Sequence, residues 1–239
     1  MQNHLFQVLT HLAMEPAAGT DSESLRDAKV NVLRATTPLK KQQLVRGQFR
    51  GYRKEKDVAP DSQVETFAAM RLNIDSDRWR GVPFYLRAGK CLPVTCTEVV
   101  IRLRPAANGP RGLGLDANTL RLQISPDILF ALELNVLDPE DQKSGKLVEL
   151  VACRQHGTDE PSAYERVLGD AMKGDAALFA RQDYSEEAWR IVDAALKAKT
   201  PVHPYKQGTW GPKAVTRISP PGGWHNPAGG DKSKRKACA

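Results

Sequence analysis

The middle of the chain alternates apolar and polar residues with a period of two, in one segment after another. The alternation runs through residues 64–74, 98–103, 120–124 and 128–136, and a further apolar segment follows at 147–153. A period of two is typical of a strand with one face buried. No helical pattern separates most of these segments, so they favour an antiparallel or mixed sheet over a βαβ arrangement.

Helical patterns stand at both ends of this strand-rich region. Apolar residues recur at helical spacing over residues 4–14, and a second helix is predicted to have its N-cap within Thr20–Glu23 and to close at Pro38. Two more apolar stripes cover residues 163–171 and 188–196. We therefore predict an α+β fold, with a large mixed, mainly antiparallel sheet and helices packed on one face.

The domain boundaries follow from composition. Residues 1–226 are predicted to form one domain, whose last part after Pro201 is irregular and packed by Trp210 and Trp224. Residues 227–239 are rich in Gly, Lys and Ala and are expected to be a disordered basic tail.

Composition excludes several classes of protein. The 239 residues are 41% hydrophobic and 26% charged, which is globular. No apolar run approaches the ~18 residues of a membrane helix. The net charge of +7 is partly concentrated in the tail and otherwise scattered among acids, which disfavours a nucleic-acid binder. Cys91 and Cys96 lack the second close pair that a zinc site needs, so no metal is expected and all four cysteines are interpreted as free thiols.

Several segments, in chain order, resemble the glucose-6-phosphate dehydrogenase family. They are MQNHLFQVLTHLAMEP at the start, Ser24–Val30, Val45–Phe49, Thr66–Ala69, Trp79–Lys90, Ala163–Asp170, Glu187–Ile191, Gly208–Pro212 and Trp224–Pro227. Each is weak alone, but their order over nearly the whole chain makes the resemblance specific. The resemblance identifies this chain as the C-terminal, substrate-binding part of such an enzyme.

The resemblance implies a reaction and three site residues. The family oxidises the C1 hydroxyl of glucose 6-phosphate to a lactone with NADP, in the pentose phosphate pathway. His4 matches the family's general base, a role that suits a neutral imidazole near pH 7. Lys90 matches a lysine that binds the substrate, and Gln123 falls where some members have a substrate-contacting glutamine. Without these motifs, His4 would be interpreted as an ordinary histidine and Lys90 as a surface lysine.

Two departures from the family pattern affect anion binding. Some members have a second basic substrate ligand five residues after Lys90, where this chain has Thr95. Some members also bind a second, structural NADP near the sheet. Arg87 matches one of its ligands, but Cys96, Val100 and Trp210 replace other cations. We therefore expect this chain to lack the structural nucleotide.

The chain contains no G-x-G-x-x-G turn between a strand and a helix and no Walker sequence. The resemblance implies that NADP is bound mainly by an N-terminal dinucleotide-binding domain, so we expect the isolated chain to be inactive. It also implies a cytoplasmic homodimer or higher homo-oligomer joined through the sheet. A non-catalytic dimerising or regulatory module derived from the enzyme is the alternative hypothesis, and nucleic-acid binding ranks far below both.

Overall fold

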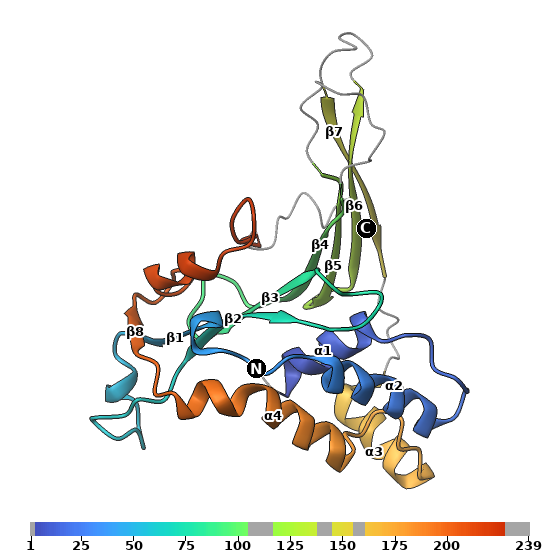
Figure 1. The fold of residues 1–239 in the computed structure, drawn as a ribbon, viewed down its shortest axis with the longest axis horizontal. Helices are drawn as coiled ribbons and strands as arrows, with labels where there is room; N and C mark the ends of the chain where they lie inside the picture. Colours follow the sequence, from blue (N-terminus) through green and yellow to red (C-terminus); the bar gives the residue numbers. More distant parts are fainter. Residues whose placement is uncertain (1–2, 105–116, 138–144, 155–160, 228–239) are drawn as a thin grey trace. The chain divides into compact units, whose positions relative to one another are not determined.

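The computed structural model describes residues 3–104, 117–137, 145–154 and 161–227. The chain divides into two compact units. The first unit contains residues 1–92 and 161–224, and the second contains residues 93–160 and 225–239. Each unit is built around its own four-stranded sheet (Figure 1).

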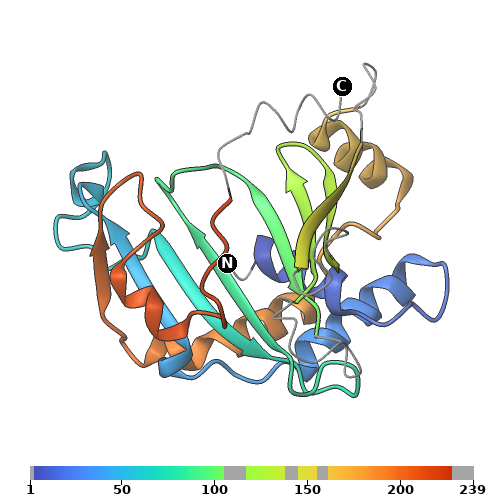
Figure 2. The ribbon, with the colours of Figure 1, turned by 90° about the horizontal axis from the view of Figure 1, so that it is seen from above.

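The sheet of the first unit has the strand order β3-β2-β1-β8. Strands β1 (Leu44–Phe49), β2 (Phe67–Asn73) and β3 (Pro83–Gly89) are antiparallel neighbours. The short strand β8 (Val202–Tyr205) pairs in parallel with β1, and Figure 2 shows the orange-red β8 beside the blue β1. The sheet is therefore mixed but mainly antiparallel, as predicted.

Three helices cover one face of this sheet. They are α1 (His4–Ala13), α2 (Ser22–Ala35) and α4 (Gln182–Lys197), which lie together beneath the sheet in Figure 1. The apolar side chains of β2 that face them are Ala68, Met70 and Leu72, and all three are buried. These residues share a face because side chains in a strand alternate.

The opposite face of the same sheet carries a second, smaller core. Phe49, Phe67 and Tyr205 are buried there against the 3₁₀ helix η3 (Lys213–Ile218) and Trp224. The C-terminal segment is thus ordered and packed, with β8 as an element that the sequence did not reveal. β8 has four residues and contains Pro204, so it is too short to show an alternation.

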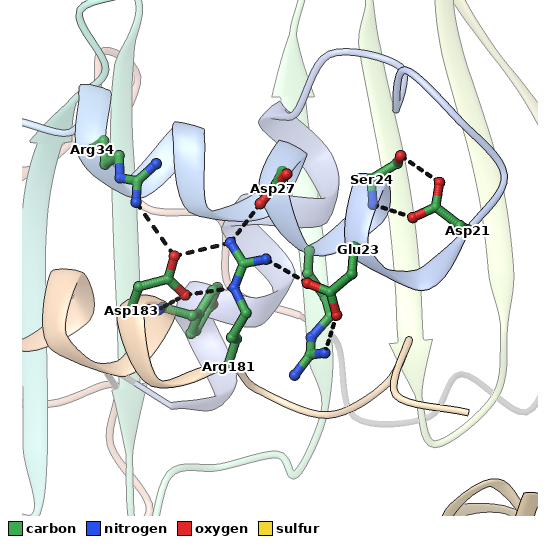
Figure 3. A network of polar contacts seen from close by, with 9 residues as sticks. Asp21, Glu23, Ser24, Asp27, Arg34, Arg181 and Asp183 are labelled. Atoms are coloured by element: carbon green, nitrogen blue, oxygen red, sulfur yellow. Dashed lines mark hydrogen bonds and ion pairs between the residues drawn. The ribbon is translucent and has the colours of Figure 1, made fainter. Parts of the chain in front are cut away.

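Helix α2 is joined to the start of α4 by a charged network centred on Arg181 (Figure 3). The Arg181 guanidinium donates to Glu23 at 2.7 Å, to Asp27 at 2.5 Å and to Asp183 at 2.9 Å. These contacts raise the pKa of Arg181, the largest cause being Asp183. The N-cap predicted for α2 is confirmed, because the Asp21 carboxylate accepts from the backbone N–H of Ser24 at 2.9 Å.

Helix α3 (Ala163–Lys173) is well capped but buries no residue within the described part of the chain. Ser162 and Glu165 form a capping box at its start, and Gly174 ends it in a left-handed conformation. Tyr164, Leu168 and Met172 repeat every fourth residue and are all strongly exposed. The predicted helix is therefore present, with an apolar stripe that the first unit leaves uncovered.

The second unit is a meander of four antiparallel strands in sequence order. They are β4 (Thr97–Arg102), β5 (Thr119–Ser125), β6 (Leu129–Leu137) and β7 (Gly145–Cys153). The α+β prediction is confirmed, but the strands form two sheets where the sequence suggested one large sheet. Alternation shows which side chains share a face, and it does not show which strands pair.

Candidate substrate-binding site

His4 is the first residue of α1 and is exposed to solvent. The rest of α1 is anchored by Phe6 and Leu9, which are buried against the first sheet. Helix α1 therefore holds His4 at a fixed helix end while leaving its imidazole accessible. No described side chain caps this helix start, since Asn3 at the N-cap makes no side-chain hydrogen bond to it.

Lys90 lies in the turn that directly follows β3, and its side chain is exposed. The backbone of this turn is held from two sides. The Lys90 N–H donates to the Thr66 carbonyl at 2.8 Å, and the Lys90 carbonyl accepts from the Tyr205 hydroxyl at 2.7 Å. The next carbonyl, that of Cys91, accepts from the Gly208 N–H at 2.8 Å. The turn thus presents the Lys90 ammonium from a fixed backbone.

Two close contacts explain the glycine before Lys90 and the conformation after it. A Cβ at Gly89 would lie 2.7 Å from the Phe67 ring, so only glycine allows the strand to approach that ring. Cys91 has φ of 52°, the left-handed region that non-glycine residues rarely adopt. A backbone held in this region against its preference is typical of a binding or catalytic site.

The residue that sequence reasoning missed is Tyr205. Its phenol is buried, and burial raises its pKa, so at neutral pH it stays protonated and acts as a donor. It also lies 3.1 Å from the Thr66 hydroxyl, within the same group of contacts. No pattern in the sequence marks Tyr205, because its partners are 115 and 139 positions away along the chain.

Arg87 is stacked between two aromatic rings on the smaller core's face. Its guanidinium carbon lies 4.8 Å from the Trp210 ring centre and 5.0 Å from the Trp224 ring centre. Cation–π contacts of this kind stabilise a packed segment. Arg87 therefore ties the C-terminal segment to β3, as expected for Trp210 and Trp224.

Gln123 lies in β5 of the second unit, opposite Glu98 of β4. Its side-chain amide donates to the Asp127 carbonyl at 3.1 Å, which closes the turn between β5 and β6. The structure thus assigns Gln123 a local structural contact. His4 and Lys90 belong to the first unit and Gln123 to the second.

An ionic cluster lies on the same face of the second sheet. Arg121 bridges Glu98 at 3.3 Å and Glu149 at 2.5 Å, and His225 lies 3.1 Å from Glu98. Burial acts to raise the pKa of Glu98, but His225 and Arg121 outweigh it and hold that pKa below its ordinary value. Only 4% of the Glu98 side chain is exposed, so its charge depends on these partners.

The cysteines differ in part from expectation. Cys91 and Cys96 are free, but Cys153 is disulfide-bonded, so the prediction of four free thiols is wrong at that position. Spacing along a sequence does not reveal which distant sulfurs meet in space. Across the residues that the structure describes, no group of three metal-ligating side chains occurs. None of the helices in that part of the chain combines the length and apolarity needed to cross a bilayer.

A profile of the glucose-6-phosphate dehydrogenase C-terminal domain matches residues 1–224. The chain belongs to the glucose-6-phosphate dehydrogenase family. The glucose-6-phosphate 1-dehydrogenase 1 of Mycobacterium tuberculosis is 40% identical over 232 residues, which are 95% of this chain and 49% of that protein. The enzyme of Aggregatibacter actinomycetemcomitans is 37% identical and covers 98% of this chain and 51% of its own length.

Solved structures agree with this assignment. The crystal structure of glucose-6-phosphate 1-dehydrogenase from Mycobacterium avium superposes with a TM-score of 0.84 at 39% identity, covering 95% of this chain and 50% of that one. A glucose-6-phosphate dehydrogenase in complex with its substrate glucose-6-phosphate has a TM-score of 0.82 at 31% identity. The chain thus spans about half the length of the dehydrogenases it matches.

The described residues do not form a dinucleotide-binding turn of the Rossmann type. The one parallel strand pair among them, β1 with β8, opens onto no glycine-rich turn that begins an α-helix. That turn is the element that approaches the pyrophosphate of such a cofactor.

Proposed function

We propose that this chain is the substrate-binding part of a glucose-6-phosphate 1-dehydrogenase and that Lys90 binds the sugar phosphate. The observation that carries this proposal is the turn at Lys90, held by Thr66, Tyr205 and Gly208 within a chain of this family. A fixed backbone with an exposed ammonium suits an anionic substrate, because less freedom is lost when the substrate binds.

His4 acts as the general base in the same proposal. Its exposed imidazole accepts the proton of the substrate's C1 hydroxyl as that carbon is oxidised to the lactone. Oxidation of the carbon requires a hydride acceptor, which we assign as NADP. Since the residues that the structure describes form no dinucleotide fold, we propose that NADP is held by the half of the relatives that lies outside the match. Gln123 remains a candidate substrate ligand that would have to exchange its contact with Asp127.

The proposed enzyme is a cytoplasmic homodimer or higher homo-oligomer joined through the second sheet. One face of that sheet carries a row of apolar side chains, with Leu120 opposite Leu132 and Leu132 opposite Leu150 across neighbouring strands. Phe130 and Leu150 on this face are 43% and 56% exposed. A sheet normally covers its apolar face. An exposed apolar face of this kind is typical of an interface between subunits.

The catalytic assignment is tested by measuring the activity of the isolated chain and of an enzyme in which the chain is fused to the N-terminal half of a relative. The purified chain should not reduce NADP with glucose 6-phosphate, since both reactants must be held together for hydride transfer. In an enzyme completed with the missing half of a relative, His4→Asn should lower the turnover number by roughly 10²–10⁴-fold, the usual contribution of a general base. The neighbouring His11→Asn serves as control. Robust turnover by the chain alone, or near-normal turnover with His4→Asn, would contradict the assignment.

A non-catalytic dimerising module is the second candidate, favoured by the same exposed apolar sheet face. Binding of glucose 6-phosphate distinguishes the two candidate functions. A module that only assembles should show no saturable binding of glucose 6-phosphate, whereas the proposed substrate domain should bind it through Lys90.

A further inference from the structure

A second basic site lies in the first unit, at the end of β8. A cavity of about 440 Å³ opens there, between β8 and η3. Its lining includes the cations Arg50, Lys206 and Lys213 together with His203. A volume of this size is within the range of small-molecule sites. The cavity lies outside the substrate turn, since neither Lys90 nor His4 lines it.

The cavity holds positive charge without compensation. Among the described residues, no Asp or Glu lines it. Within the part of the chain that the structure describes, Arg50, Lys206 and Lys213 form no ion pair. A further cation, Arg217, lies next to the cavity with its guanidinium 3.5 Å from the His203 ring nitrogen.

This arrangement differs from the way other cations of the first unit are placed. Arg46 is paired with Glu65 at 2.8 Å, Arg78 with Glu15 at 2.7 Å, and Arg181 with three carboxylates. Like charges gathered around one concavity repel each other, and their field raises the local concentration of anions. The uncompensated cluster therefore indicates an anionic ligand.

The cavity is built on fixed backbone. Tyr205 lines it and is buried, with its hydroxyl bound to the Lys90 carbonyl. The Arg50 N–H donates to the Tyr205 carbonyl at 2.8 Å, which holds the two strand ends together. Gly211, with φ of +101°, packs so closely on Phe67 that a Cβ would lie 2.4 Å from the ring. The cations thus extend from a rigid floor of Tyr205, Gly211 and Pro212.

We propose that this cavity binds a small polyanion with at least two phosphate groups, such as the pyrophosphate group of a phosphorylated metabolite. Lysine and arginine side chains suit phosphate oxygens because they donate charge-assisted hydrogen bonds. Several cations around a cavity larger than one phosphate favour a diphosphate over a monophosphate. The site is independent of the proposed dehydrogenase function, and it shares only the Tyr205 segment with the Lys90 turn.

The proposal is tested by isothermal titration calorimetry of the purified full chain with inorganic pyrophosphate at fixed ionic strength. We expect saturable binding at one site, weakened about tenfold or more by Lys206→Ala/Lys213→Ala. Lys206→Arg/Lys213→Arg should retain it. The matched control Lys40→Ala/Lys41→Ala removes the same charge from exposed positions that do not line the cavity, and it should bind like the wild type.

Three outcomes would overturn the proposal. The first is the absence of saturable pyrophosphate binding. The second is an equal loss of affinity in both alanine pairs, which would indicate only the general positive field of the chain. The third is loss of binding in Lys90→Ala, which would place the anion at the substrate turn. Glucose 6-phosphate is titrated in parallel. It should not displace pyrophosphate if the two sites are distinct, and competitive displacement would place both anions at one site and also overturn the proposal. Thermal melting of each variant verifies that it is folded.

Discussion

At the scale of single residues, the structure shows how the lysine proposed to bind the substrate is presented from a fixed backbone. Lys90 is exposed like many other lysines, but its backbone is hydrogen-bonded to Thr66 and Tyr205. Thr66 directly precedes β2, and Tyr205 is the last residue of β8. The ammonium therefore has a fixed origin, whereas a typical surface lysine extends from a segment that moves.

Lys90→Ala should weaken binding of glucose 6-phosphate to this chain markedly, because the charge contacts groups that change little during reaction. Thr95→Lys, which restores the second cation found in some relatives, should tighten binding by about 1 kcal/mol, within the range of a charge-assisted hydrogen bond. Isothermal titration at constant salt measures both. In the completed enzyme the same changes should appear in the Michaelis constant for the sugar phosphate and far less in the turnover number. An unchanged affinity in Lys90→Ala would make Lys90 only a surface lysine.

The three candidate residues could be found from the sequence only through family motifs. Lys90 follows a recognisable strand and glycine, and His4 opens a recognisable helix. Tyr205 could not be found this way, because its role is a hydrogen bond to a carbonyl that only the fold brings near. Any residue supplies a backbone carbonyl, so a hydrogen bond to it requires no particular residue type at the accepting position. A sequence pattern therefore does not reveal such a contact.

At the scale of elements, helices and long strands were predicted well and the short strand was not. α1, α2 and α4 each have several buried apolar residues at helical spacing, which is the signal that the prediction used. β8 depends on β1 for its existence, since it pairs with residues more than 150 positions earlier. The same limitation explains why one sheet was expected where there are two.

The ionic cluster of the second sheet should make this unit sensitive to acid. The pKa of Glu98 is lowered from 4.5 in the folded chain, so its stabilisation is present above that value and is lost as the pH falls through the folded pKa. Glu98→Gln should therefore reduce stability at neutral pH, and the difference from wild type should shrink as the pH falls below the ordinary value of 4.5. Arg121 pairs with both Glu98 and Glu149, and the His225 ring lies 3.1 Å from Glu98.

Urea unfolding monitored at several pH values measures this effect. Glu55→Gln, at an exposed position in the loop after β1, is the matched control and should leave the pH profile unchanged. A pH profile for Glu98→Gln that runs parallel to that of the wild type would show that Glu98 contributes no linked stability.

At the scale of the whole molecule, the proposed oligomer depends on an unusual distribution of polar and apolar surface in the second unit. On the ionic face, Arg121 and Glu98 expose only 12% and 4% of their side chains. The apolar face carries Phe130 and Leu150, both more than a third exposed. This distribution is the reverse of a single-faced sheet in a monomer.

Leu150→Lys should therefore shift the chain toward monomer in sedimentation velocity at micromolar concentration. Leu147→Lys is a matched control, because Leu147 is 61% exposed, similar to the 56% of Leu150, but lies on the opposite face of β7. The wild type and the control should remain associated. A monomeric wild type, or an equal effect of both substitutions, would exclude the apolar face as the interface.

The parallel pairing of β1 with β8 has a consequence for how the chain is made. Arg46 in β1 donates to the Thr200 carbonyl, which lies 154 positions later in the chain. The four strands of the second unit, by contrast, pair with their neighbours in the sequence. On a ribosome, the second unit can close its hairpins as each strand emerges. The first unit cannot complete its sheet until β8 has been synthesised, and until then one edge of β1 stays unpaired. During that interval, the exposed edge is the part of the nascent polypeptide that most needs protection from aggregation.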